Sequence, residues 1–340
     1  MAATIVNGAF RSQRITGQQR YASEIADRLA AREDFTELRP DGRWQGSRAA
    51  EWAWTLARLP LLADKAPLLS LTARAPVVRS QVLVVHDLFV LTNPEWFSRG
   101  YIATHTPLLR AQLRAAAGVI AVSEPVAEQV AGMYRGPVAV APNAPSQVFA
   151  VSDSSADAAV LKKRGLEPGS YLLTVGSHDP RKNLRALARA YSQIPQGLRR
   201  AHPLVVVGGG SSVFRDHDVE WPDETVATGY VSDDELRALY AGARAVVFPS
   251  LAEGFGLPLV EAAAAGAQVL VVSDIPVFRW ICGEDAVYVD AGSPKSIAQG
   301  LSLAILDDLT RPSISTDRFN WEASAAVVAD FCAATMGGAH

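Results

Sequence analysis

The stretch LAEGFGLPLVEAAAAG, residues 251–266, lies between two apolar runs, ARAVVFPS at 243–250 and AQVLVVSD at 267–274. Apolar runs of this length are typical of buried strands, and the segment between them favours a helix that begins at its Gly-Leu-Pro turn. A strand, a helix and a second strand in this order predict a parallel β-α-β unit. The stretch therefore indicates an α/β fold.

The same alternation extends along the rest of the chain. In the second half, strands are predicted at 171–176, 202–210, 225–230 and 286–290, and helices at 183–194 and 233–243. In the first half, strands are predicted at 3–8, 82–87, 119–123 and 138–143, and helices at 16–32, 106–118, 124–134 and over most of 39–66. We therefore expect two Rossmann-like, doubly wound parallel-sheet domains of the α/β class that face a central cleft.

A polar, Ser- and Asp-rich stretch at 146–170 separates the two halves and contains a Pro-Gly turn, so we expect the hinge there. An amphipathic helix is predicted at 319–336, and we expect it to pack back on the N-terminal domain. The predicted domains are 1–150 and 151–318, followed by the C-terminal helix segment 319–340.

Composition and charge limit the function classes. The first 150 residues contain 16 Lys and Arg against 12 Asp and Glu, a net charge of +4, and the rest contain 16 against 23, or −7, which together give −3. The uneven charge is either chance or a sign of an anionic partner for the first half. Two cysteines exclude a disulfide scaffold, and no apolar run reaches the roughly 18 residues of a membrane span. We expect a cytoplasmic protein, at most peripheral at the inner face of a membrane.

The turn inside the opening stretch has the chemistry expected of a diphosphate site. Gly254 and Gly256 allow a ligand to approach the backbone, and the amides around Gly256 and Leu257 begin a helix whose dipole favours an anion. Glu253 precedes this turn and would face whatever the phosphate carries, whereas Glu261 could accept two hydroxyl hydrogen bonds, as from a ribose. The alternative is that Glu253 caps the helix and Glu261 is a solvated helix residue.

Further polar residues follow other strand ends, where ligands of open α/β sheets bind. Arg181 and Lys182 would open a helix, where cations oppose the dipole, and a phosphate would compensate them; alternatively they are solvated surface cations. Gly176 and Ser177 end the strand before them. In the first half, the candidate residues are Gly17, at the start of a helix, and His86 and Asp87, which end the strand 82–87. A single histidine at such a position is alternatively structural.

In this context the chain resembles a family-four retaining glycosyltransferase with the two-Rossmann glycosyltransferase-B fold. The most specific motif is EGFGLPLVEA at 253–262, which is similar to the E-x7-E signature of that family. Five further motifs fit in order: ITGQQRYA, VVHDLFVLTNPEWF, VSEPVAEQV, VGSHDPRKN and FNWEASA. Two positions depart from the family pattern, because Ser177 replaces a frequent basic residue and Asn143-Ala144 replaces the usual Asn-Gly.

The resemblance implies roles for individual residues. Glu253 and His86 would contact the donor sugar, Glu261 would bind the ribose, and Lys182 with Arg181 would neutralise the donor diphosphate. Gly17 would make room for the phosphates or the sugar. The remaining donor-binding residues would be Gly176, Ser177, Gly254, Phe255, Gly256 and Leu257. The acceptor would be bound in the N-terminal domain by Asp87, Trp96 and Arg99, although Trp96 is alternatively a packing residue.

The implied activity is transfer of a hexose with retention of configuration, in polysaccharide biosynthesis. The first donor to consider is GDP-mannose and the second is a UDP-sugar. The acceptor would be a saccharide, free or linked to a polyprenyl diphosphate, with peripheral membrane contact in the second case. No metal, other cofactor or nucleic acid is expected. The alternatives are a sugar-nucleotide epimerase or hydrolase on the same fold and a non-catalytic nucleotide-sugar-binding partner.

Overall fold

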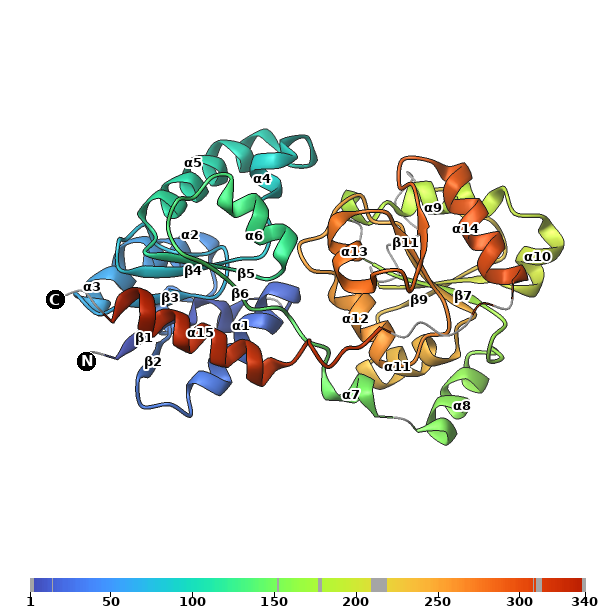
Figure 1. Ribbon diagram of the computed structural model, residues 1–340, viewed down its shortest axis with the longest axis horizontal. Coiled ribbons are helices and arrows are strands. Elements are labelled where there is room, and N and C mark those ends of the chain that lie inside the picture. Colours follow the sequence, from blue (N-terminus) through green and yellow to red (C-terminus); the bar gives the residue numbers. More distant parts are fainter. Residues whose placement is uncertain are drawn as a thin grey trace. The chain divides into compact units, whose positions relative to one another are not determined.

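The computed structural model describes residues 3–13, 15–151, 153–176, 179–208, 219–307, 309 and 314–337. The chain divides into two compact units. The first consists of Met1–Asn143 together with Phe319–His340, and the second of Ala144–Arg318. Each unit contains one six-stranded parallel sheet, so both are α/β units (Figure 1).

In the first unit the strands lie in the order β2-β1-β3-β4-β5-β6. Their bounds are β1 (Thr4–Asn7), β2 (Phe35–Leu38), β3 (Leu68–Ser70), β4 (Gln81–Val85), β5 (Gly118–Ala121) and β6 (Val138–Val140). The helices are α1 (Gly17–Leu29), α2 (Arg48–Ala53), α3 (Leu59–Ala63), α4 (Phe89–Thr92), α5 (Arg99–Ala115), α6 (Glu124–Ala131) and α15 (Trp321–Met336). A π-helical turn, Trp54–Arg58, joins α2 to α3.

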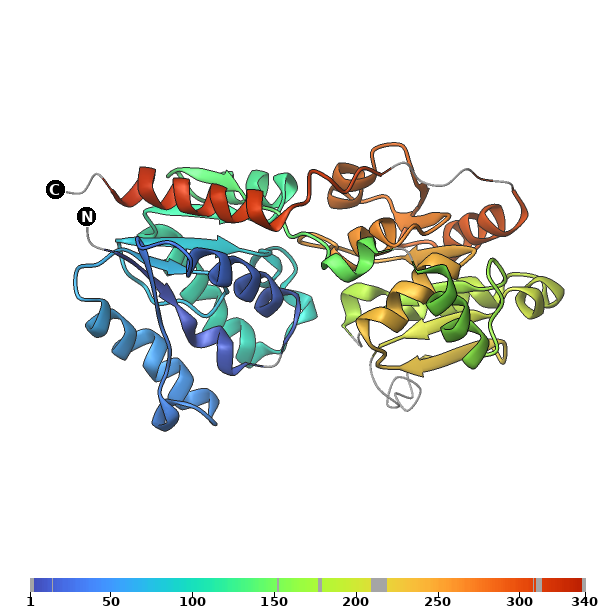
Figure 2. The ribbon, with the colours of Figure 1, turned by 90° about the horizontal axis from the view of Figure 1, so that it is seen from below.

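The central strands of this sheet are covered on both faces, which explains their apolar sequences. Leu83 and Val119 pack in one buried cluster with residues of α5 and α6. The helix α15 lies along β4, β5 and β6 and packs on α1, where Arg28 and Glu322 form an ion pair of 2.8 Å (Figures 1 and 2). The last helix of the chain therefore belongs to the first unit.

In the second unit the order is β12-β11-β10-β7-β8-β9. Its strands are β7 (Leu172–Val175), β8 (Leu204–Val207), β9 (Thr225–Gly229), β10 (Ala245–Phe248), β11 (Leu270–Ser273) and β12 (Val287–Val289). Its helices are α7 (Gln147–Ala150), α8 (Ser154–Lys163), α9 (Leu184–Ser192), α10 (Gln196–Ala201), α11 (Asp233–Gly242), α12 (Leu257–Ala264), α13 (Pro276–Cys282) and α14 (Pro294–Leu306). The helices α9 and α14 share a buried apolar cluster with β7, β8, β10 and β11, and so cover one face of the sheet.

The segment predicted to be the hinge, 146–170, contains α7 and α8 instead, and both pack on α11. Asp153 begins α8 by accepting a hydrogen bond from Ala156, and Asp157 forms an ion pair of 2.9 Å with Arg237 of α11. Because these contacts hold the segment in the second unit, the units divide after Asn143 and not after residue 150.

Candidate active site

The loop that follows β7 carries Arg181 and Lys182 on one turn of 3-10 helix, Pro180–Lys182. The carboxylate of Asp179 accepts hydrogen bonds from the backbone amide of Arg181 at 3.0 Å and from its Nε at 2.9 Å. Burial alone would raise the pKa of Asp179, but these hydrogen bonds outweigh burial and hold the pKa below its usual value. Asp179 therefore holds Arg181 in place and balances its charge.

Lys182 reaches the loop after β10, where its Nζ lies 2.7 Å from Oε1 of Glu253. The same Oε1 accepts a hydrogen bond of 2.8 Å from the hydroxyl of Ser250. Because β7 and β10 are neighbours in the sheet, both loops lie at its carboxyl edge. The residues predicted to bind the diphosphate and the sugar thus form a direct ion pair, with side chains only 21% and 13% exposed.

The turn after Glu253 has a backbone that requires glycine. Gly256 has φ +91° and ψ +44°, in the left-handed region, and a Cβ there would lie 2.9 Å from Cε1 of Phe278. The helix α12 begins at Leu257, and no side chain among the described residues caps it at Gly256. Its first amides and its dipole therefore suit an anion. Phe255, which follows Gly254 in this turn, is only 5% exposed. Its ring packs edge-on against Trp280, and this contact holds the turn in place.

Glu261 lies in the second turn of α12 and is only 5% exposed. This burial contradicts the alternative of a solvated helix residue. A buried carboxylate needs hydrogen-bonding or charged partners, because losing water around an ion is costly. The position is consistent with a ribose-binding carboxylate.

Glycines also bring the ends of β7 and β8 close together. Gly208 has φ +109°, and a Cβ there would lie 2.4 Å from the carbonyl oxygen of Gly176. A Cβ at Gly176 would in turn be 3.5 Å from the side chain of Lys182. A side chain at Gly208 would therefore clash with the end of β7, whereas one at Gly176 would make an ordinary contact with Lys182. Ser177, the other donor-binding residue predicted here, lies outside the described residues.

His86 directly follows β4 in the first unit and is buried. Its Nε2–H donates a hydrogen bond of 2.9 Å to the carbonyl of Leu71, and its ring lies edge-on to Tyr21. Burial lowers the pKa of His86 to about 4, against the opposing effect of the hydrogen bond to Leu71. The imidazole is therefore neutral near pH 7, and its Nδ1 is the nitrogen left to accept a hydrogen bond.

His86 should make stability depend on pH. Its pKa is about 4 in the folded chain against 6.5 for an ordinary histidine, so the unfolded chain binds the proton more tightly. The contribution of neutral His86 to the free energy of unfolding is complete above pH 6.5 and is lost as the pH falls towards 4. The loss is about 2 kcal/mol at about pH 5. Denaturant unfolding at about pH 7.5 and about pH 5 should show this loss in the wild type, and a smaller one in His86→Gln. Equal losses in both proteins would contradict it.

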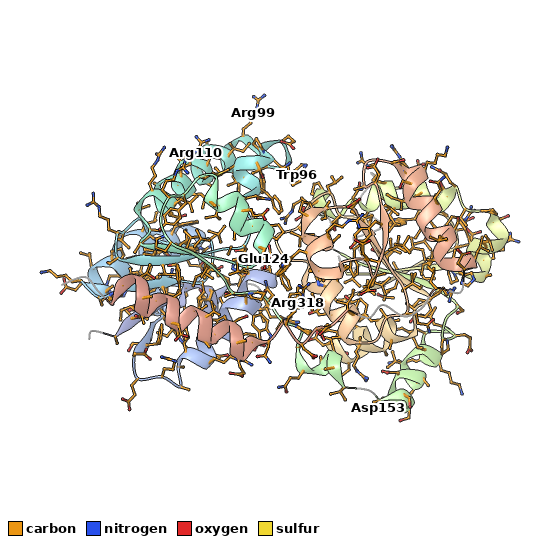
Figure 3. All side chains as sticks on the ribbon, in the orientation of Figure 1. Trp96, Arg99, Arg110, Glu124, Asp153 and Arg318 are labelled. Carbon is orange, nitrogen blue, oxygen red and sulfur yellow. The ribbon has the colours of Figure 1, made fainter. Side chains whose placement is uncertain are left out.

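The other candidates of the first unit have different surroundings. Gly17 is the exposed first residue of α1, and no side chain caps that helix at Thr16. Asp87 is half-buried and accepts a hydrogen bond of 3.3 Å from the amide of Phe89. Trp96 is half-buried and lies edge-on to Phe89, which supports the packing alternative. Arg99 begins α5 and extends from the surface (Figure 3).

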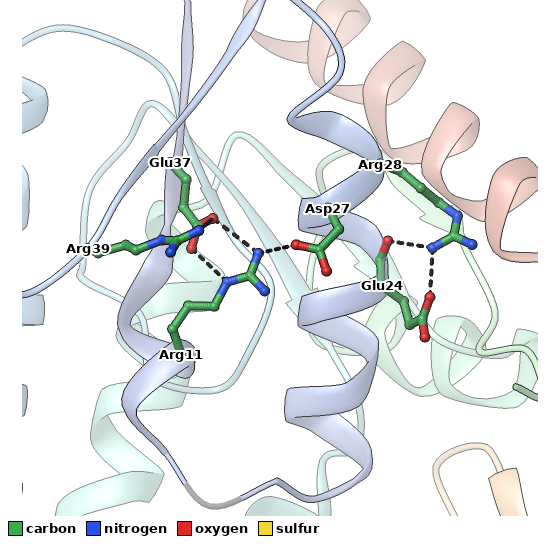
Figure 4. A network of polar contacts seen from close by, with 6 residues as sticks. All are labelled: Arg11, Glu24, Asp27, Arg28, Glu37 and Arg39. Carbon is green, nitrogen blue, oxygen red and sulfur yellow. Dashed lines mark hydrogen bonds and ion pairs between the residues drawn. The ribbon is translucent and has the colours of Figure 1, made fainter.

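A polar network holds the 3-10 turn that directly follows β1 (Figure 4). Arg11 binds Glu37 of β2 at 3.0 Å and Asp27 of α1 at 2.5 Å, and Arg39 also binds Glu37. The 3-10 turn Gly8–Ser12 is thereby tied to both elements beside it. This network involves residues far apart in sequence, and nothing in their spacing predicts it.

The sequence assigns no individual role to Ser250 or Asn183, yet both contact the candidate site. Ser250 lies three residues before Glu253 and two residues after the end of the buried apolar strand β10, and this position is a usable signal. Asn183 follows the two cations and has the left-handed φ of 55° that asparagine tolerates better than most residues. Its partners lie on other loops and only the fold reveals them.

No group of three or more His, Cys, Asp or Glu side chains that could hold a metal ion occurs in the described part of the chain. In the same part, no helix is long and apolar enough to cross a membrane.

Comparisons with known proteins indicate a glycosyl transferase family. Residues 159–320 match the family described as Glycosyl transferases group 1. O-antigen chain mannosyltransferase B of Escherichia coli is 27% identical over 91% of this chain and 93% of its own length. O-antigen chain mannosyltransferase RfbU of Salmonella typhimurium is 30% identical over 65% of this chain and 60% of its own length.

Two solved structures share the fold. Sucrose-phosphate synthase from Thermosynechococcus elongatus superposes with a TM-score of 0.75 at 18% identity, covering 100% of both chains. WaaG, described as a glycosyltransferase involved in lipopolysaccharide biosynthesis, superposes with a TM-score of 0.71 at 16% identity, covering 99% of this chain and 100% of its own.

Proposed function

We propose a donor and an acceptor for this chain, which is a group 1 glycosyl transferase with the glycosyltransferase-B fold. The donor is GDP-mannose, with a UDP-hexose as the second candidate, and the sugar is transferred with retention of configuration. The acceptor is a saccharide, free or linked to a polyprenyl diphosphate, in polysaccharide assembly. Mannose is favoured because relatives such as the two O-antigen enzymes are named mannosyltransferases.

The observation that carries the proposal is the ion pair between Lys182 and Glu253, at the strand ends beside the start of α12. When the donor binds, its diphosphate replaces Glu253 as the partner of Lys182 and approaches the first amides of α12. Glu253 is then released to accept hydrogen bonds from the sugar, while Glu261 binds the ribose. The roles of His86 and Gly17 rest on the family resemblance alone.

In the proposed reaction the acceptor oxygen attacks the anomeric carbon on the face from which the diphosphate leaves. The bond from that carbon to the phosphate oxygen breaks, its electron pair goes to the phosphate, and the phosphate takes the acceptor's proton. Lys182 and the amides of α12 stabilise the charge that develops on the leaving group, and we propose that no resident metal is needed for this. Arg181, which is held by its hydrogen bond to Asp179, adds its positive charge to this stabilisation.

A lipid-linked acceptor requires the protein to reach a membrane surface, and the first unit has a suitable one. Leu56, Leu61 and Leu62 are 44%, 74% and 44% exposed on the segment from α2 to α3. Arg58 is exposed on the same segment, and Lys65 is exposed two residues after its end. Exposed leucines beside cations suit the interface of an anionic bilayer. We therefore propose peripheral contact with anionic lipid through this segment.

The comparisons do not favour the two alternatives. The family and the relatives are named as transferases. If the chain were an epimerase or a hydrolase, we would expect its relatives to be named as epimerases or hydrolases. The same transferase names give no support to a non-catalytic nucleotide-sugar-binding partner.

The test is a panel of nucleotide sugars and acceptors. We expect GDP-mannose to raise the thermal midpoint more than UDP-glucose, and to support transfer to lipid-linked saccharide in anionic vesicles, which should also sediment the protein. If only a UDP-sugar stabilises the protein, the donor is that UDP-sugar and not GDP-mannose. Transfer only to soluble saccharides, without vesicle binding, would contradict the membrane proposal. If no nucleotide sugar binds, the proposed function is wrong.

A further inference from the structure

At least three contacts between described residues join the loops after β7 and β10 at the carboxyl edge of the second sheet. Each of these contacts pairs one residue of the first loop with one of the second, and two of the three involve a side chain. The contacts are Asn183 Nδ2 to the Pro249 carbonyl at 3.0 Å, the Leu251 amide to the Arg181 carbonyl at 2.7 Å, and Lys182 Nζ to Glu253 at 2.7 Å.

The contact made by Asn183 extends to a third loop. Its Nδ2 also donates a hydrogen bond of 2.8 Å to the carbonyl of Ala291, which follows β12. In the sheet β12 is separated from β10 by β11, so this one amide spans the ends of strands that are not neighbours. The backbone of Asn183, at φ 55° and ψ 33°, points the side chain there, while its carbonyl begins α9 by accepting from Leu187.

Donor binding affects these contacts unequally. In the proposed reaction Lys182 leaves Glu253 for the diphosphate, so its contact between the loops is lost when the ligand arrives. The amide of Asn183 faces two backbone carbonyls, has no charge to exchange with a phosphate, and keeps its bonds. Together with the backbone bond from the Leu251 amide to the Arg181 carbonyl, the side chain of Asn183 then holds the cation loop at a fixed distance from the loop of Glu253.

We propose that Asn183 is a positioning residue of the transferase: it sets the spacing between the diphosphate-binding and sugar-binding loops without touching the donor. This inference rests on the proposed function. Since a displacement of about 1 Å between reacting groups can cost about 100-fold in rate, a contact that fixes loop spacing has a measurable kinetic effect.

Asparagine combines two properties here, and substitutions can separate them. Glycine adopts the left-handed backbone at no steric cost but has no side-chain amide, so Asn183→Gly removes the hydrogen bonds without straining the backbone. Aspartate keeps the shape and a tolerance for this backbone, yet its carboxylate would place negative charge against the carbonyls of Pro249 and Ala291. Protonation of this carboxylate would restore one hydrogen-bond donor.

The matched control is Thr174→Val in β7. The hydroxyl of Thr174 donates a buried hydrogen bond of 2.9 Å to the carbonyl of Val247 in β10. This variant also removes a side-chain hydrogen bond between the same two strands, but inside the sheet and not between the loops. It therefore reports what a comparable loss of stability does to activity.

The experiment measures kcat and KM for the donor, together with the thermal midpoint, in wild type and variants. We expect Asn183→Gly to lower kcat between about tenfold and 100-fold and to raise the donor KM, while Thr174→Val keeps wild-type kinetics. The activity of Asn183→Asp relative to wild type should rise as the pH is lowered, because the protonated side chain can again donate to a carbonyl. This pH readout keeps the inference testable if the glycine variant does not fold.

Two outcomes overturn the inference while leaving the proposed function in place. The first is a wild-type rate in Asn183→Gly, or a relative activity of Asn183→Asp that does not change with pH. The second is an equal loss of activity in Thr174→Val, which would show that activity follows stability only. A wild-type protein that neither binds nor uses nucleotide sugars would overturn the proposed function, and the inference with it.

Discussion

A Lys182→Met variant is expected to lose about 10²- to 10³-fold in kcat/KM for the nucleotide-sugar donor, or roughly 3–4 kcal/mol. Methionine keeps the length of the side chain and its packing beside Gly176 but has no charge. The leaving diphosphate would then lack the positive charge of Lys182. Nucleoside diphosphate affinity should fall as well, because Lys182 would contact the phosphates in the ground state. Initial rates and calorimetric titration with GDP and UDP measure both effects.

The matched control for this variant is Lys163→Met. Lys163 is an exposed cation in the last turn of α8, within the same unit, and it has no place in the candidate site. It should retain wild-type kinetics and affinity. Because Ser250 would be the one described side chain left to donate a hydrogen bond to Glu253 in Lys182→Met, the thermal midpoint must be measured alongside. A folded Lys182→Met protein with kinetics like the control would remove Lys182 from the site.

The central strands could be predicted because burial on both faces makes each of them a continuous apolar run in the sequence. Runs such as 204–207 and 245–248 are buried on both faces, so each residue is apolar whatever its neighbours are. The two strands that the sequence does not reveal have no such signal. β2 is an edge strand of four residues that includes Thr36 and Glu37, and β3 has three residues.

The helical region predicted over most of 39–66 shows another limit. The structure has a 3-10 turn at Gly42–Trp44 and then a helix from residue 48 to 63 that is interrupted by the π-helical turn Trp54–Arg58. Pro60 follows that turn and has no amide hydrogen for an α-helical bond, so a local change in helix type next to it is understandable. Composition indicates a helix here, but it does not indicate the switch from α-helical to π-helical hydrogen bonding.

The candidate site was predictable where a motif carries it and not where the fold assembles it. Glu253 and Lys182 follow strand ends that the apolar runs mark, but their pairing requires β10 to lie next to β7. The contacts of Asn183 need the order of three strands. Burial of Glu261 likewise depends on which face of α12 packs on the sheet. Strand order arises from packing between distant segments, so single motifs do not contain it.

A Glu253→Gln variant is expected to affect turnover and nucleotide affinity in opposite directions. Transfer should fall about 10²- to 10³-fold, because the carboxylate that accepts the sugar's hydrogen bonds is lost. Affinity for GDP or UDP should stay unchanged or increase, since Lys182 no longer has to leave an ion pair of 2.7 Å before it binds phosphate. Lys182→Met, in contrast, should lower both.

The control for Glu253→Gln is Glu224→Gln, which breaks an ion pair of 2.9 Å with Arg199 elsewhere in the same unit and should change neither quantity. Calorimetry with the free nucleotide, together with initial rates with the sugar nucleotide, separates the two effects. If Glu253→Gln weakens nucleotide binding as much as Lys182→Met does, Glu253 contacts the nucleotide itself. The division of the site into a phosphate cation and a sugar acid would then be wrong, because removing the acid should release the cation.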